Sequence, residues 1–217
     1  MLKKLIFFMF LNVVILISNP VRAIEIDFAF TADDWINAWY VNGVLQPTLE
    51  YSSAANWHLS KDVTLDLEIG KKYEIVWQTI NESSPGLSPG GFLAEISSSV
   101  PIITSSMLSS TSWEVAILRD VTNPISDFSA LNWISAVDYG TNSDSSTIWY
   151  QYNNGPIEGI SGDARWVWLG INWPNPSTPG FSDSIFIKTT LTPVPEPALL
   201  LLLGLGLFGL AAIRRID

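Results

Sequence analysis

The feature that most constrains the fold is a hydrophobic period of two residues, which starts at Ile24 and recurs along most of the chain. In the first run, Ile24, Ile26, Phe28 and Phe30 alternate with acidic or small residues. This period places successive side chains on opposite faces of a strand, whereas an amphipathic helix requires a period of 3.6. Roughly ten such runs, separated by turn residues, predict an all-β protein that is either a β-sandwich or a barrel.

Turn residues and aromatic runs locate the strands more closely. Asn42-Gly43 lies between two apolar runs and predicts a hairpin, because a type I′ turn needs positive φ at both central residues. We expect a turn from Thr31 to Asp34, and a single helical turn within Asp127 to Ile134. The expected strands include residues 24–30, 35–41, 63–67, 73–79, 90–96, 113–118, 148–152, 164–169 and 184–192.

The first 23 residues have the pattern of a secretory signal peptide. Two lysines provide a basic start, an apolar stretch follows from Leu5 to Ile17, and Val21-Arg22-Ala23 is a small-residue cleavage site. We therefore expect cleavage after Ala23. Residues 24–193 then form one β-sandwich domain, because a stretch of about 170 residues is long enough to bury a core.

Charge and residue types exclude several classes of function. Residues 24–193 contain six Lys or Arg and 19 Asp or Glu, a net formal charge of −13, whereas nucleic-acid binding requires a basic surface. The chain has no cysteine, which excludes disulfides and thiolate catalysis. His58 is the single histidine and no nucleophile-elbow pattern surrounds it, so we expect a surface or hydrogen-bonded role.

The C-terminal stretch, residues 194–217, has three parts: Val194-Pro195-Glu196-Pro197, an apolar run from Ala198 to Ile213, and the basic pair Arg214-Arg215. The prolines prevent a helix from extending upstream, and such a run crosses lipid only as a helix. At about 1.5 Å per residue it spans roughly 24 Å, less than a hydrocarbon core of about 30 Å. The run therefore predicts a marginal transmembrane helix, with the arginines on the cytoplasmic side.

This order of parts resembles the PEP-CTERM sorting signal of Gram-negative bacteria. The matching residues are Pro195-Glu196-Pro197, the Leu/Gly-rich run and Arg214-Arg215. The resemblance implies that an exosortase in the inner membrane cleaves near the Pro-Glu-Pro. The protein would then be released to the cell surface or into an exopolysaccharide matrix. An ordinary single-pass anchor is the alternative interpretation.

Several short strings within residues 24–193 stand in a recognisable order: Phe30 to Asp34, Tyr40 to Gly43, Gly91 to Ile96, Ser112 to Val115 and Ala164 to Trp168. Together they are similar to galactose-binding-like jelly-roll domains. The resemblance implies a jelly-roll sandwich, and such domains occur as carbohydrate-binding modules and as non-catalytic parts of glycosidases. The fold alone does not imply sugar binding.

Ten tryptophans suggest sugar binding, because an exposed indole can stack on a sugar ring while Asp, Asn or Arg side chains bind the hydroxyls. Burial between two sheets is the alternative, which we favour for Trp77, Trp113, Trp166 and Trp168. A period of two places Trp166 and Trp168 on one face, and Trp35 and Trp39 on one face of their own strand. The tryptophans beside expected loops are the candidates for ligand binding: Trp57, Trp133, Trp149 and Trp173.

Asp33 and Asp34 are the candidate metal ligands. Carboxylates suit Ca²⁺, a hard cation that prefers oxygen. Alternatively, the two aspartates cap a turn and accept hydrogen bonds from its amides. The Asp-rich loop of an EF-hand is absent from the sequence.

These observations predict an exported, non-enzymatic protein of the cell surface or extracellular matrix, which binds exopolysaccharide or another glycan through its sandwich. Two alternatives remain open. One is a purely structural matrix protein without a defined ligand. The other is a small glycoside hydrolase, which needs two carboxylates flanking a cleft, although no string here is typical of hydrolysis.

Overall fold

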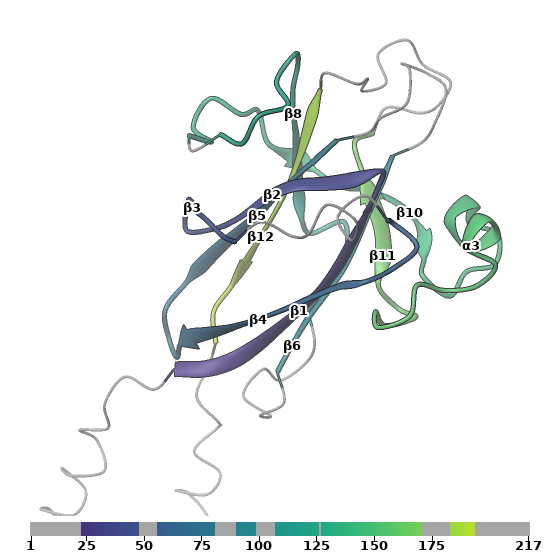
Figure 1. The fold of residues 1–217 in the computed structure, drawn as a ribbon, viewed down its shortest axis with the longest axis horizontal. Helices are drawn as coiled ribbons and strands as arrows, with labels where there is room; N and C mark the ends of the chain where they lie inside the picture. Colours follow the sequence, from purple (N-terminus) through teal and green to yellow (C-terminus); the bar gives the residue numbers. More distant parts are fainter. Residues whose placement is uncertain are drawn as a thin grey trace, which may run out of the picture.

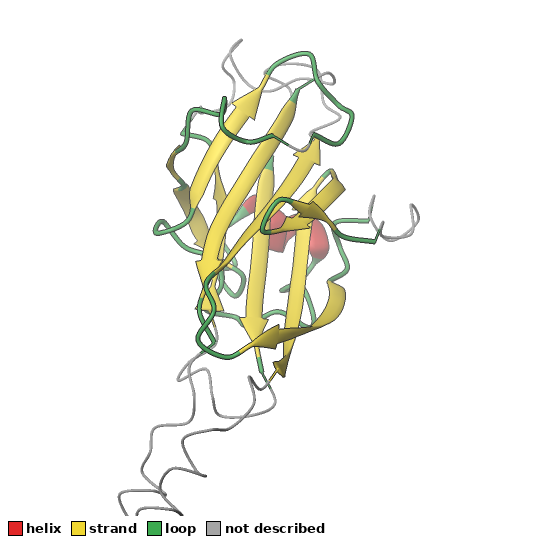
Figure 2. Ribbon diagram, turned by 90° about the vertical axis from the view of Figure 1, so that its left-hand side faces the viewer, coloured by secondary structure: helices red, strands yellow, loops and turns green. Residues whose placement is uncertain are grey.

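The predicted all-β fold is confirmed by a computed structural model, which describes residues 23–47, 56–80, 90–98, 107–125, 127–170 and 183–193. Two antiparallel sheets form a β-sandwich (Figure 1, Figure 2). Sheet A has the order β10 (Val137–Thr141), β11 (Arg165–Trp168), β6 (Gly91–Ser97), β1 (Ala23–Asp33) and β4 (Lys61–Glu68), with β7 (Met107–Leu108) beside β6. Sheet B has the order β3 (Val44–Leu45), β2 (Trp35–Val41), β5 (Tyr73–Ile80), β12 (Ser184–Leu191), β8 (Glu114–Leu118) and β9 (Ile134–Ser135).

The long strand β1 pairs with β4 on one side and β6 on the other, and its alternate apolar side chains are buried. The predicted turn from Thr31 to Asp34 is wrong. Residues Thr31, Ala32 and Asp33 continue the strand, because they pair with Leu93, Phe92 and Gly91 of β6. This extension places the Asp33 side chain on the outer face of sheet A, which becomes important for the site below.

The hairpin between β2 and β3 is confirmed. Asn42 and Gly43 have φ values of 50° and 74°, as a type I′ turn requires. The remaining strand predictions are also confirmed within one to three residues at each end, with the exception of residues 148–152.

Aromatic side chains fill the space between the sheets. Trp77 and Trp113 stack in parallel with ring centroids 5.5 Å apart, and the Phe30 ring contacts both Trp39 and Trp77. The prediction of burial between the sheets is confirmed for Trp77, Trp113 and Trp168, whereas Trp166 is equally buried but lies on the outer face of sheet A. Such aromatic contacts add to the stability that burial of their area provides.

The predictions about shared faces fail at two strands. A register shift between Ile36 and Ala38 reverses the alternation within β2, so that Ile36 and Trp39 both face the core and Trp35 does not. In β11, Trp168 packs between the sheets together with Val167, whereas Trp166 packs on the outer face of sheet A. Periodicity therefore located these strands but not the direction of every tryptophan.

Each sheet also has a smaller apolar cluster on its outer face. On sheet B, residues 119–125 and 127–133 cover Tyr40, Val76 and Phe186; we call these residues the sheet-B cover. On sheet A, residues 142–164 cover Leu93 and Trp166; we call this segment the sheet-A cover. The sheet-A cover contains the helix α3 (Ile148–Asn153), so the predicted strand at residues 148–152 is wrong. Within residues 127–133, which the structure describes, the predicted helical turn does not form.

The start of β1 and the end of β12 lie at the same end of the sandwich. Ala23 pairs with Glu68 at the end of β4, Leu191 pairs with Tyr73 at the start of β5, and a short turn joins these two partners. Most of the expected signal peptide and the whole of residues 194–217, including the expected helix at 198–213, lie outside the described residues. In the part of the chain that is described, no helix is sufficiently long and apolar to span a membrane.

Candidate functional site

The sheet-A cover is attached to the sheet at the end of β1. The Trp149 indole Nε1 donates a hydrogen bond to Asp33 Oδ2 at 3.0 Å, and both side chains are buried. Gly91 lies opposite Asp33 in β6, and a β-carbon placed on Gly91 would come within 2.6 Å of the Trp149 ring. Glycine is therefore required at this point so that the indole can lie directly against the strand.

Three tryptophans from different segments meet here. The Trp149 and Trp166 rings stack with centroids 4.7 Å apart, and the Trp57 ring meets Trp166 edge to face at 6.3 Å. Tyr139 contacts Trp149 edge to face from β10. Two of the predicted candidates, Trp57 and Trp149, are thus brought into one cluster, but Trp149 is only 2% exposed and is a structural residue.

Polar side chains define both ends of α3. The Thr147 hydroxyl oxygen accepts a hydrogen bond from Tyr150 N and caps the first turn, and Asn154 closes the last turn in the left-handed conformation. Asp144 accepts hydrogen bonds from the backbone and hydroxyl of Ser146, and these bonds hold the pKa of Asp144 below its usual range. These caps explain why an aromatic, β-branched stretch forms a helix.

The loop that follows α3 is fixed by two buried contacts. The Asn142 amide donates to the carbonyls of Ile157 and Ile160 at 3.0 and 2.9 Å, and its oxygen accepts from Ile157 N. Glu95 Oε2 on β6 accepts from Ser161 N at 2.7 Å. Hydrogen bonds of Asn142 and Glu95 therefore fix the later part of the sheet-A cover, in addition to the aromatic stack.

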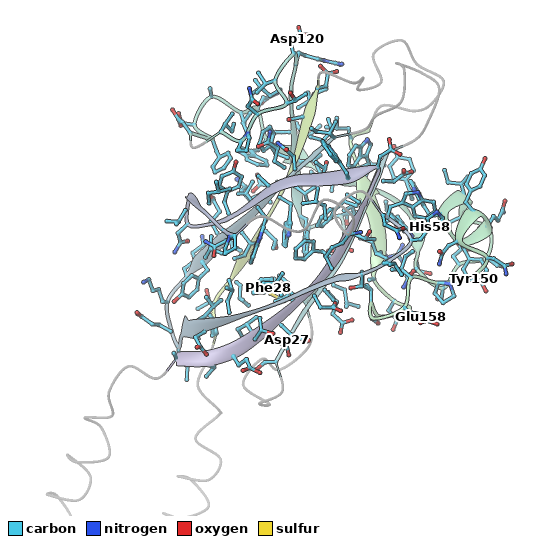
Figure 3. The ribbon with its side chains drawn as sticks, in the orientation of Figure 1. Asp27, Phe28, His58, Asp120, Tyr150 and Glu158 are labelled. Atoms are coloured by element: carbon cyan, nitrogen blue, oxygen red, sulfur yellow. The ribbon has the colours of Figure 1, made fainter. Side chains whose placement is uncertain are left out.

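The solvent-facing side of this region combines aromatic rings with a carboxamide. Tyr152 is 78% exposed, His58 is exposed and stacks on Trp57 with centroids 3.7 Å apart, and His58 Nδ1 lies 2.9 Å from Asn153 Oδ1. Figure 3 shows His58, Tyr150 and Glu158 around α3. We call Trp57, His58, Tyr152 and Asn153 the α3 surface. The expectation of a surface or hydrogen-bonded role for His58 is confirmed, and the residue meets both descriptions.

A buried lysine holds the loop that carries Trp57 and His58. The Lys61 ammonium donates to Thr31 Oγ1 at 3.1 Å, to Leu59 O at 2.8 Å and to Asn56 O, and the residue is 3% exposed. Burial lowers the pKa of Lys61 to about 8. Because all three protons have an oxygen acceptor, Lys61 is a structural cation and not a surface charge that could bind an anion.

The other two predicted binding tryptophans do not join this surface. Trp133 belongs to the sheet-B cover, where the Lys188 ammonium lies 4.2 Å from its ring centre. Trp173 lies outside the described residues. Of the α3 surface, Tyr152 and Asn153 were not named by the predictions, and His58 was expected at the surface but not as a binding residue. The Asn153-Asn154-Gly155 run after a Trp/Tyr-rich stretch was the available signal, since it marks both the helix end and a polar loop.

The predicted metal ligands are engaged in a different contact. Asp33 is 8% exposed and binds the Trp149 indole. Burial, followed by the hydrogen bond and negative charge of Asp34, raises the pKa of Asp33 to about 8. Across the described segments, no group of three His, Cys, Asp or Glu side chains is arranged to hold a metal ion. Asp33 therefore attaches the sheet-A cover through Trp149. Ca²⁺ binding by Asp33 and Asp34 stays a prediction.

Comparison with protein families adds one finding. The model of the PEP-CTERM protein-sorting motif matches residues 193–215. The chain carries a PEP-CTERM sorting motif. It is therefore an exported protein whose C-terminal region anchors it transiently in the membrane, and an exosortase processes it before its release at the surface. No curated protein and no solved structure matches the chain.

Proposed function

We propose that this PEP-CTERM protein binds a neutral glycan through the α3 surface and has no catalytic activity. The observation that carries the proposal is the exposed Tyr152 ring next to Asn153, whose side chain faces His58. An exposed aromatic ring suits the apolar face of a sugar, and an exposed imidazole suits its hydroxyls. The stack of His58 on Trp57 and the caged Lys61 hold the surface before a ligand arrives, which reduces the entropy lost on binding.

The charge of the surroundings supports a neutral ligand. Asp62 follows the Trp57 loop, Glu158 and Asp163 belong to the sheet-A cover, and all three are exposed, with Ser60 donating to Asp62. The basic side chains of the same segments are occupied, because Lys61 is buried and Arg165 pairs with Asp138. A polysaccharide rich in uronate would meet like charge here, whereas a neutral hexose polymer would not.

The position of the surface supports a role outside the cell. The α3 surface lies at the Asp33 end of β1, while Ala23 and Leu191 lie at the other end of the sandwich, roughly 30 Å away along the strand. A chain held in the membrane by residues after Pro193 would therefore expose the α3 surface away from the membrane. The α3 surface is therefore accessible to a ligand both before and after processing.

A glycoside hydrolase is less well supported by the same geometry. Asp33 has a raised pKa, as an acid catalyst needs, but the side chain is buried under the Trp149 ring. The carboxylate beside it, Asp34, is the next residue in the chain and so does not lie across a cleft from Asp33. A hydrolase requires two carboxylates on either side of an accessible cleft. We therefore propose a binding role, and no hydrolysis of any bound glycan is expected over hours at high protein concentration.

A structural matrix protein without a ligand is the second candidate, and burial of the tryptophans favours it. Six of the nine described tryptophans are buried and the other three are only partly exposed. An array of neutral, amino-sugar and uronate glycans, probed with residues 24–193 in the presence and absence of Ca²⁺, separates the candidates. Binding confined to neutral glycans is expected. A signal no stronger than that of the heat-denatured protein would favour the structural role.

A further inference from the structure

The sorting motif begins on a residue that belongs to the folded sandwich. The motif match starts at residue 193, and Pro193 is buried. The Gly70 backbone N–H donates a hydrogen bond to the Pro193 carbonyl at 2.6 Å. Only Val194 separates Pro193 from the Pro195-Glu196-Pro197 sequence. The fold and the sorting signal therefore overlap by one residue.

The contact between Gly70 and Pro193 continues the pairing of β12 with β5. Leu191 pairs with Tyr73 and is 2% exposed, and the Tyr73 hydroxyl accepts a hydrogen bond from Glu68 N across the turn. Gly70, at the tip of this turn, has a φ of 79°, which turns its N–H toward Pro193. Pro193 lies beyond the last paired residue of β12, Leu191, so it can detach without breaking a strand pair.

The distance to the membrane is limited by chain length. Four residues separate Pro193 from Ala198, where the apolar run starts. Five extended steps cover at most about 17 Å, so the Gly70 end of the sandwich lies near the membrane surface while the chain is anchored. The sorting enzyme must therefore meet the folded sandwich beside the motif.

We propose that the contact between Gly70 and Pro193, which we call the clamp, restricts processing, and that the sorting enzyme acts on chains in which Pro193 has detached from the sandwich end. An enzyme that cleaves a backbone binds residues on both sides of the bond in extended form. With the clamp closed, residues up to Pro193 are unavailable to it. The rate of processing then depends on the fraction of chains in which the clamp is open.

The test follows conversion of the full chain, from the membrane-anchored precursor to the released product, in cells that process it. A Gly-Ser spacer of eight residues between Pro193 and Val194 leaves the clamp intact but makes its opening unnecessary. We expect the half-time to fall about five-fold, the change in an equilibrium constant that corresponds to one ordinary hydrogen bond. An unchanged or longer half-time would overturn the proposal, because the clamp would then be irrelevant or the sandwich end would assist the enzyme.

A pair of substitutions within β12 provides the control for stability. Leu191→Ala removes apolar packing beside the clamp, whereas Ile187→Ala removes it from the middle of the same strand. Only Leu191→Ala is expected to shorten the half-time, although both lower the melting temperature. If both variants shortened the half-time equally, general unfolding would explain the faster processing, and the proposed role of the clamp would be contradicted.

Discussion

The two covers both bury an apolar cluster on the outer face of a sheet, but different side chains attach them. The sheet-B cover is joined to its sheet by the neutral amide of Gln78, which donates to Asn123 O and Ser184 Oγ and accepts from the Tyr40 hydroxyl. The sheet-A cover is joined by the carboxyl group of Asp33 under the Trp149 indole. The sheet-B cover is also held by Asp183, which pairs with Arg119 and accepts a hydrogen bond from Asp120 N. Burial raises the pKa of Asp33 to about 8, so the stability of the cover that carries the α3 surface should depend on pH near neutrality.

The largest expected effect comes from removing the aromatic anchor of the sheet-A cover. Trp149→Ala deletes a ring that stacks on Trp166 and leaves a cavity against Gly91, and such changes cost about 3–5 kcal/mol of stability. Hydrogen exchange should increase in residues 142–164 and remain slow in residues 119–133. Trp149→Phe, which keeps a ring but loses the N–H donor, should cost less. Equal loss of protection in both covers would contradict their independence.

The matching change in the sheet-B cover should be smaller. Gln78→Met keeps the volume of a buried side chain but leaves its hydrogen-bond partners unsatisfied, which costs about 1–3 kcal/mol. Because an amide does not titrate, the loss should be the same at pH 5 and pH 9 in urea denaturation. A loss that changes with pH would show that Gln78 is coupled to an ionisable group.

Asp33→Asn should remove the loss of sheet-A cover stability that the charge of Asp33 causes as the pH rises toward 8. The pKa of Asp33 is raised from 3.8 to about 8, so the folded state binds a proton more tightly than the unfolded state. Stability therefore falls as pH rises from about 4 to 8. Asparagine retains an oxygen for Trp149 without this charge. We expect Tm to change little at pH 4 and to rise by a few degrees at pH 8.5, measured by circular dichroism. An equal shift at both values would contradict this role.

The smallest expected effect is at Trp133. Lys188 lies over the Trp133 ring and 3.0 Å from Glu114 Oε2, and Glu114 is half exposed. Lys188→Met should cost less than about 1 kcal/mol, because a cation over an aromatic ring and a surface ion pair are both weak in water. Chemical denaturation in 0.05 and 0.5 M salt measures the cost. A loss comparable to that of Gln78→Met would mean that the cation organises the whole sheet-B cover.

The sheets could be predicted from the sequence because their information is local. Alternation marks each strand, and Asn42-Gly43 marks the hairpin, as the φ values of both residues confirm. The covers have no such period, because an outer cluster needs only a few apolar residues in irregular chain. In residues 148–153 the β-branched and aromatic composition favoured a strand, but the Thr147 cap and the Asn154-Gly155 stop determined a helix.

The candidate site was only partly predictable for the same reason. Trp57 was identified from its position beside a loop, and it is part of the α3 surface, where it stacks with His58. Trp149 was selected on the same grounds and is buried, because its exposure depends on Asp33 and Gly91, which are far away in sequence. Tyr152 became a candidate only when the helix turned it toward solvent. The different exposure of these three aromatic residues is determined by contacts between distant segments, which no local sequence pattern encodes.

The central claim is that the sheet-A cover, and not the sheet-B cover, carries the binding surface. It is tested most directly by measuring retention of the protein on an immobilised neutral polysaccharide for the wild type, Tyr152→Ala and Trp133→Ala. Tyr152→Ala should weaken retention about ten-fold, equivalent to about 1.4 kcal/mol, with an unchanged melting temperature, and Trp133→Ala should retain wild-type binding. Loss of binding in Trp133→Ala alone, or no retention of the wild type by any neutral polymer, would contradict the claim.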